Sequence, residues 1–217
     1  MTHAPPKRLG IAIVGMVICA AMVACSSGSG DAHSSAHALP PDSKAALERV
    51  FAPTLDRLGV RLTRGALVDL RTGKPSPTGK HLAVYVEPTG TYTNEDYARG
   101  TVRTLRAFIP AAFERWGGLT SFDICQEPLP AVDARPEPTP VTKVDVTKKA
   151  SRKVRWDDVD LTRLLRDAKR LGSEALSVYV KPDVRLTGFY QDAAAKANGG
   201  GAAGTSSPVP TSPSYSR

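Results

Sequence analysis

Apolar residues between positions 43 and 192 recur with two periods, one typical of helices and the other of strands. Spacing by three and four residues predicts amphipathic helices over 46–58, 94–116 and 158–171. Thr93 and Asp157 are expected to cap the second and third of these helices, because each is followed by an aspartate three residues later. Glycines directly after the three segments are expected to end them.

Five strands are predicted, over 60–70, 82–87, 122–125, 143–148 and 176–181, most of them from alternation of apolar and other side chains, with Arg64 as the one misfit in the first. The first two can form a hairpin with a long connection, 71–79. Residues 127–140 include five prolines and are expected to form an extended connection.

From residue 82 onward the elements follow the order strand, helix, strand, strand, helix, strand. This order predicts an α+β fold of the ferredoxin-like (βαββαβ) type, a two-layer sandwich, with an additional N-terminal helix and strand. Its first and last strands, LAVYVEP and LSVYVKP, are identical at five of seven positions. Either strand chemistry or a duplicated unit explains that similarity. In this plan the two strands are neighbours, and Tyr85 and Tyr179 stand on the open sheet face as a possible partner-binding surface.

The first 24 residues have the pattern of an export signal. Lys7 and Arg8 precede sixteen uncharged residues, LGIAIVGMVICAAMVA. As a helix this run is about 24 Å long, which is shorter than the hydrocarbon core of about 30 Å. A positive start, a short apolar run and small residues at its end are typical of a cleaved signal.

The end of that run, Met22-Val23-Ala24-Cys25, resembles the lipobox of bacterial lipoprotein precursors. The resemblance implies that Cys25 receives a diacylglyceryl group and becomes the first residue of a chain anchored to the extracytoplasmic face of the cell membrane. Double acylation gives stable anchoring. The Arg, Ala, Pro and Gly usage is similar to that of high-G+C actinobacteria. An ordinary secretory signal and an uncleaved anchor are the alternatives.

Composition then divides the remaining chain into a tether, a body and a tail. Residues 25–42 and 193–217 are rich in Ser, Gly, Ala and Pro, which predicts a flexible tether and a disordered tail around one domain, 43–192. A hydrophobic content of 41% excludes a wholly disordered chain. Cys125 is the only cysteine after position 25, so no disulfide is expected. Loss of residues 1–24, with two positive charges, lowers the net charge from +8 to +6.

No catalytic set, cofactor or metal site is expected from the sequence. Cys125 falls in an apolar strand and is interpreted as a buried hydrophobe. His81 beside a loop is interpreted as a solvated histidine. His33 and His37 lie in the tether, where a weak metal site is the less favoured reading. The acidic cluster at 157–160 is explained by helix capping.

Two rows of arginines are the sharper pattern, because their spacing places each row on one helix face. The residues are Arg99, Arg103 and Arg106 on one helix, and Arg163, Arg166 and Arg170 on the other. Together they can form an anion-binding surface, while solvated helix faces are the plainer explanation. Nucleic acid is not an expected partner of an exported protein.

These observations favour a lipid-anchored, non-enzymatic envelope domain that binds an unknown protein or cell-wall component. A polyanion-binding module that uses the arginine rows is the first alternative. An envelope hydrolase with acidic residues distant in sequence is the second.

Overall fold

The computed structural model describes residues 37–129 and 139–199. The predicted export signal, Cys25, most of the tether and most of the tail lie outside these residues. Among the described residues, none of the helices combines the length and the apolar character needed to cross a membrane.

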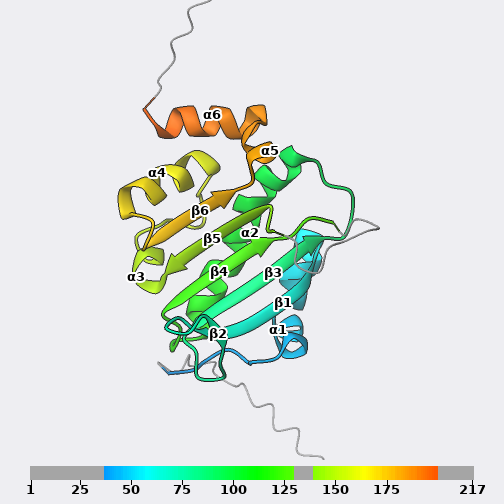
Figure 1. Ribbon diagram of the computed structural model, residues 1–217, viewed down its shortest axis with the longest axis vertical. Helices are drawn as coiled ribbons and strands as arrows, with labels where there is room; N and C mark the ends of the chain where they lie inside the picture. The colour runs from blue at the N-terminus through cyan, green and yellow to red at the C-terminus, as the bar shows by residue number, and fades with distance from the viewer. Residues whose placement is uncertain (1–36, 130–138, 200–217) are drawn as a thin grey trace, which may run out of the picture. The chain divides into compact units, whose positions relative to one another are not determined.

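A six-stranded mixed sheet forms the centre of the fold (Figure 1). Its strands follow the order β2-β1-β3-β4-β5-β6. Only β3 and β4 are parallel, and every other neighbouring pair is antiparallel. The strands are β1 (Val60–Asp69), β2 (Lys74–Pro75), β3 (His81–Pro88), β4 (Ser121–Gln126), β5 (Thr142–Thr147) and β6 (Leu176–Val180). All five predicted strands are therefore confirmed, and the short β2 lies within the predicted loop.

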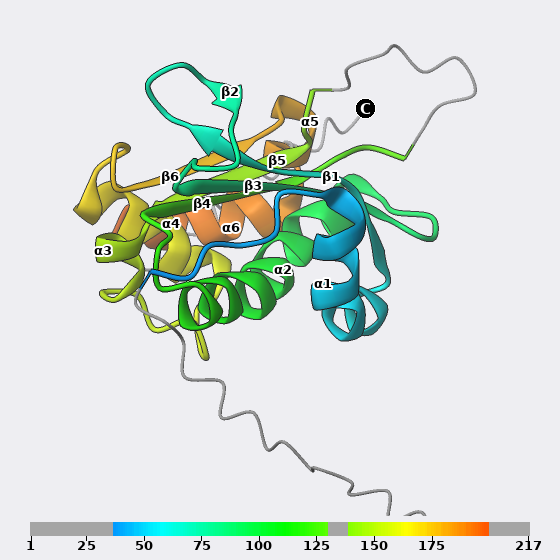
Figure 2. The same ribbon diagram turned by 90° about the horizontal axis from the view of Figure 1, so that it is seen from below.

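One face of the sheet is covered by helices, as Figure 2 shows for α1, α2, α4 and α6. The helix α6 packs on α4 and α2. The helices are α1 (Lys44–Leu58), α2 (Asn94–Arg115), α3 (Lys148–Ser151), α4 (Leu161–Leu171), α5 (Pro182–Arg185) and α6 (Gly188–Ala197). Mixed α/β architecture is thus confirmed, whereas α3, α5 and α6 were not predicted. Because α6 reaches Ala197, the ordered body continues five residues beyond the expected boundary at 192.

The observed N-cap agrees with the prediction for the second helix and differs from it for the third. Thr93 and Asp96 form the expected capping box at the start of α2. The third helix is capped by Asp160 and not by Asp157, because the Asp160 side chain accepts a hydrogen bond from the Arg163 N–H at 2.7 Å. The helix consequently begins three residues later than expected.

The hydrophobic core lies between the helices and the sheet. Phe108 of α2 is fully buried, and its ring centroid lies 4.8 Å from that of Phe51 in α1. Phe122 of β4 and Leu82 of β3 are equally inaccessible beneath the helices. The valines of the two similar strands face this layer, as predicted.

The predicted adjacency of these two strands is wrong, and the sheet order therefore differs from the ferredoxin-like plan. One edge of β3 pairs with β1 and the other with β4, so neither edge is available to β6. Tyr85 and Tyr179 do lie on the same sheet face, but Cys125 and Lys143 stand between them in one cross-strand row. Three strand spacings of about 4.8 Å separate the two tyrosines.

We expect Phe108→Ala to lower the free energy of unfolding by about 3–5 kcal/mol, because it empties a central core position. Leu186→Ala is the matched control, since Leu186 is 72% exposed, and it should change stability by less than about 0.5 kcal/mol. Urea unfolding followed by circular dichroism measures both values. Equal effects of the two substitutions would contradict this location of the core.

Candidate functional site

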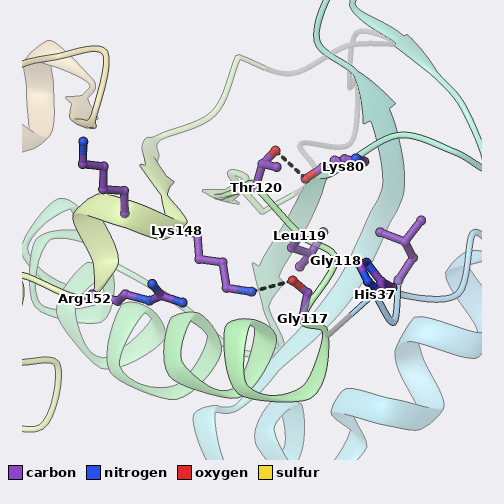
Figure 3. A pocket seen from close by; sticks show the side chains of 10 residues that line it. His37, Lys80, Gly117, Gly118, Leu119, Thr120, Lys148 and Arg152 are labelled. Atoms are coloured by element: carbon purple, nitrogen blue, oxygen red, sulfur yellow. Dashed lines mark hydrogen bonds between the residues drawn. The ribbon is translucent and has the colours of Figure 1, made fainter. Parts of the chain in front are cut away.

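A pocket of about 600 Å³ opens at the end of the sheet where β3 and β4 begin and β5 ends. Four segments far apart in the sequence meet there (Figure 3). We call it the cationic pocket, and its lining residues are His37, Leu39, Lys80, Gly117, Gly118, Leu119, Thr120, Lys148, Lys149 and Arg152.

The turn after α2 brings the start of the described chain to this pocket. The Gly118 N–H donates a hydrogen bond to the Ala38 carbonyl at 2.8 Å. A Cβ atom at Gly118 would lie 2.7 Å from the His37 carbonyl oxygen, which is closer than van der Waals contact allows. Glycine is therefore required for the close approach of segment 37–39 to this turn.

Backbone hydrogen bonds hold the other three segments together. The Thr120 N–H donates to the Lys80 carbonyl at 2.8 Å, and the Lys148 N–H donates to the Thr120 carbonyl at 2.8 Å. The Thr120 hydroxyl adds a second hydrogen bond to the Lys80 carbonyl, at 3.1 Å. These contacts position the lysines on a rigid frame at the sheet end.

Positive charge dominates the cationic pocket. Lys80, Lys148, Lys149 and Arg152 contribute four cationic side chains, and none of the ten lining residues is acidic. The Lys148 ammonium donates to the Gly117 carbonyl at 2.6 Å (Figure 3). None of these four side chains forms an ion pair within 37–129 or 139–199. Clustered cations without compensating carboxylates attract an anion.

The arginine row of α2 lies at a separate groove of about 440 Å³. Here the guanidinium of Arg99 pairs with Glu95 at 2.6 Å and stacks over the Phe189 ring, 4.1 Å from its centroid. Arg106 donates to the Val159 carbonyl at 2.8 Å. Arg103 lines the same groove, which also contains Asp96 and Asp160.

The arginine row of α4 does not line that groove. Arg163 pairs with Asp158 at 3.0 Å, and Arg170 pairs with Asp167 at 2.8 Å. Arg166 donates a long hydrogen bond of 3.4 Å to the Lys196 carbonyl. Because acids neutralise much of this charge, the cationic pocket is the stronger candidate for binding an anion.

The sheet face that carries none of the described helices, here called the open face, contains the row of Tyr85, Cys125, Lys143 and Tyr179, which ranges from buried to exposed. The Arg64 guanidinium lies 4.1 Å from the centroid of the Tyr85 ring, a cation–π geometry. Tyr179 is exposed, whereas burial raises the pKa of Tyr85. Cys125 is fully buried, which confirms the sequence-based interpretation.

The interpretation of His81 as a solvated loop residue is wrong. His81 begins β3, is buried, and its Nδ1 lies 2.8 Å from the Ser121 hydroxyl. Its Nε2 lies 3.5 Å from Oδ2 of Asp123, and Asp145 completes a cluster on the open face. The partners of His81 are at least 40 residues away in sequence, so local patterns could not reveal them.

The residues of the cationic pocket were also missed by the sequence analysis. The signal that could have found part of it is the basic cluster at 148–153, where four of six residues are lysine or arginine. Protein-family models, curated proteins and solved structures were compared with the chain, and none matches it.

We expect Cys125 to resist alkylation in the folded protein. Burial, followed by the negative charge of Asp123, raises the pKa of its thiol to about 12. At pH 8 the reactive thiolate is therefore at least about 1,000-fold rarer than in the unfolded chain, where the pKa is about 8.5. Iodoacetamide labelling with and without urea, followed by mass spectrometry of the Cys125 peptide, measures the ratio. Equal labelling rates would contradict this environment.

Proposed function

We propose that this protein is a lipid-anchored lipoprotein of the cell envelope that binds, without catalysis, a phosphate-bearing anionic group in the cationic pocket. The single observation that supports this ligand class is the presence of four cationic side chains and no acidic one among the residues that line the pocket. Lysine ammoniums act as point charges that suit phosphate, and Arg152 adds a planar donor group.

The predicted lipid anchor at Cys25 indicates which phosphate-bearing groups would be near the cationic pocket. Eleven residues, 26–36, separate Cys25 from His37, which lines the pocket. A Gly/Ser-rich coil of this length has a root-mean-square span of about 18 Å. Phospholipid headgroups of the anchoring bilayer are therefore the first candidate ligands. A phosphorylated cell-wall polymer presents the same chemistry and is the alternative source.

Charge reversal in the pocket should weaken binding to anionic vesicles. Lys149→Glu together with Arg152→Glu should reduce affinity for phosphatidylglycerol vesicles by at least about 30-fold, since each basic residue near such a surface contributes about 1 kcal/mol. Vesicle cosedimentation measures the affinity, with mature chain that carries Cys25→Ala so that acylation does not contribute.

The matched control is Arg103→Glu together with Arg166→Glu. It changes the net charge of the chain by the same amount as the pocket variant, but on the helices α2 and α4. It should retain most of the binding. An equal loss of vesicle affinity in both double variants would indicate diffuse electrostatic attraction and contradict binding in the pocket. A loss of affinity in the control alone would favour the arginine rows as the binding surface. Competition by soluble glycerol phosphate separates recognition of the phosphate from attraction to the vesicle surface.

Membrane attachment should depend on Cys25. The variant Cys25→Ala should incorporate no fatty acid in cells and should leave the membrane fraction in 1 M salt, where the Debye length of about 3 Å screens electrostatic binding. Metabolic labelling with a palmitate analogue and intact-mass analysis measure acylation. Unchanged membrane partitioning of this variant would contradict the lipoprotein assignment.

A further inference from the structure

A second polar cluster lies on the open sheet face, where β3, β4 and β5 run side by side. Asp123 of β4 is directly opposite Asp145 of β5, and on its other side it pairs with Ala83 of β3, two residues after His81. The register therefore places all three polar side chains on one face. One imidazole nitrogen and two carboxylate oxygens from these residues lie within 4.8 Å of one another.

The histidine is oriented by a neighbouring side chain. The 2.8 Å contact joins His81 Nδ1 to the Ser121 hydroxyl, and Nε2 points toward Asp123. When Nδ1 carries the proton and donates it to Ser121, Nε2 presents a lone pair to the cluster. Such a hydrogen bond on the second ring nitrogen is characteristic of histidines that bind metals.

The buried carboxylate of Asp123 is only partly satisfied by its neighbours. Its side chain is only 4% exposed, and Oδ2 accepts a hydrogen bond from Lys143 at 2.8 Å. Oδ1 is buried and has no hydrogen-bond partner among the described residues. A buried carboxylate oxygen without a partner is destabilising and uncommon in folded proteins.

The charge balance of the cluster also favours a cation. Asp123 and Asp145 face each other as cross-strand partners in β4 and β5. Two facing carboxylates therefore share the single ammonium of Lys143 as their permanently charged neighbour in the described cluster. A bound divalent cation would supply the further positive charge that two adjacent carboxylates attract.

We propose that His81, Asp123 and Asp145 bind one divalent transition-metal ion, with Zn²⁺ as the best match. One imidazole and two carboxylates are a ligand set that suits Zn²⁺, whereas Mg²⁺ and Ca²⁺ prefer oxygen ligands alone. Ligands about 2.1 Å from a tetrahedral ion lie about 3.4 Å apart. The ion therefore draws the three side chains closer together, and water completes its coordination. Ser121 acts as a positioning residue.

Zinc titration of the full chain tests this site after removal of metal with a chelator. Isothermal titration calorimetry should show one tight ion per chain, and His81→Gln or Asp145→Asn should each weaken it at least 100-fold. The double variant His33→Gln/His37→Gln is the matched control, because it removes the two tether histidines and should retain the tight ion. Mg²⁺ and Ca²⁺ should not displace Zn²⁺ at equal concentration.

Two further measurements keep the test decisive if a cluster variant fails to fold by circular dichroism. Ser121→Ala should weaken zinc binding by about 10- to 100-fold, because it removes only the partner of His81. Co²⁺ bound to the unsubstituted protein should give the visible absorption of a low-symmetry site with nitrogen and oxygen ligands. Absence of saturable zinc binding, or its loss only in the tether control, would overturn the proposal. Vesicle binding through the cationic pocket is measured separately and does not depend on this result.

Discussion

The hydrogen bonding of both edges of β3 is the constraint on which the rest of this structure depends. On one side β1 pairs with β3 as an antiparallel hairpin partner, and on the other β4 pairs in parallel after the helix α2 has crossed the sheet. A parallel neighbour requires such a crossover connection. With both edges of β3 used, β5 and β6 extend the sheet beyond β4, and β2 pairs with the other edge of β1. These two pairings fix the central order β1-β3-β4 and exclude β6 as a neighbour of β3.

That order has direct consequences for the polar residues. Because β3, β4 and β5 are neighbours, His81 lies beside Asp123, and Asp123 lies opposite Asp145. In a sheet where β6 paired with β3, Asp123 and His81 would not share adjacent strands. The same arrangement brings the start of β3, the start of β4 and the end of β5 together at one end of the sheet. The turn 117–120 and α3 complete the cationic pocket there.

Local patterns predicted the five longer strands and the helices α1, α2 and α4, but they missed α3, α5 and α6 and did not specify how the strands pair. Alternation between Val84, Tyr85 and Val86 assigns one side of β3 to the core, and the capping chemistry of Thr93 specifies the start of α2. No local signal distinguishes β4 from β6 as the neighbour of β3, because both have suitable apolar residues. The interpretation of His81 was wrong because the neighbouring strand was not known. Beside a polar loop it resembles a solvated side chain, and only its cross-strand neighbours make it a buried one.

The two candidate sites differ from Arg163 and Arg170 of α4 in how completely their charges are compensated. Arg163 and Arg170 each contact an acidic side chain nearby in sequence, so their positive charge is largely neutralised at short range. In the cationic pocket the Lys148 ammonium donates to the Gly117 carbonyl and forms no ion pair with the described residues, and Oδ1 of Asp123 has no hydrogen-bond partner among them. The cost of an uncompensated charge is greatest where solvent is excluded. That cost applies to the buried Asp123, and a bound cation would remove it. Lys80, Lys149 and Arg152 are exposed, so in the cationic pocket it is the absence of nearby carboxylates that favours an anion.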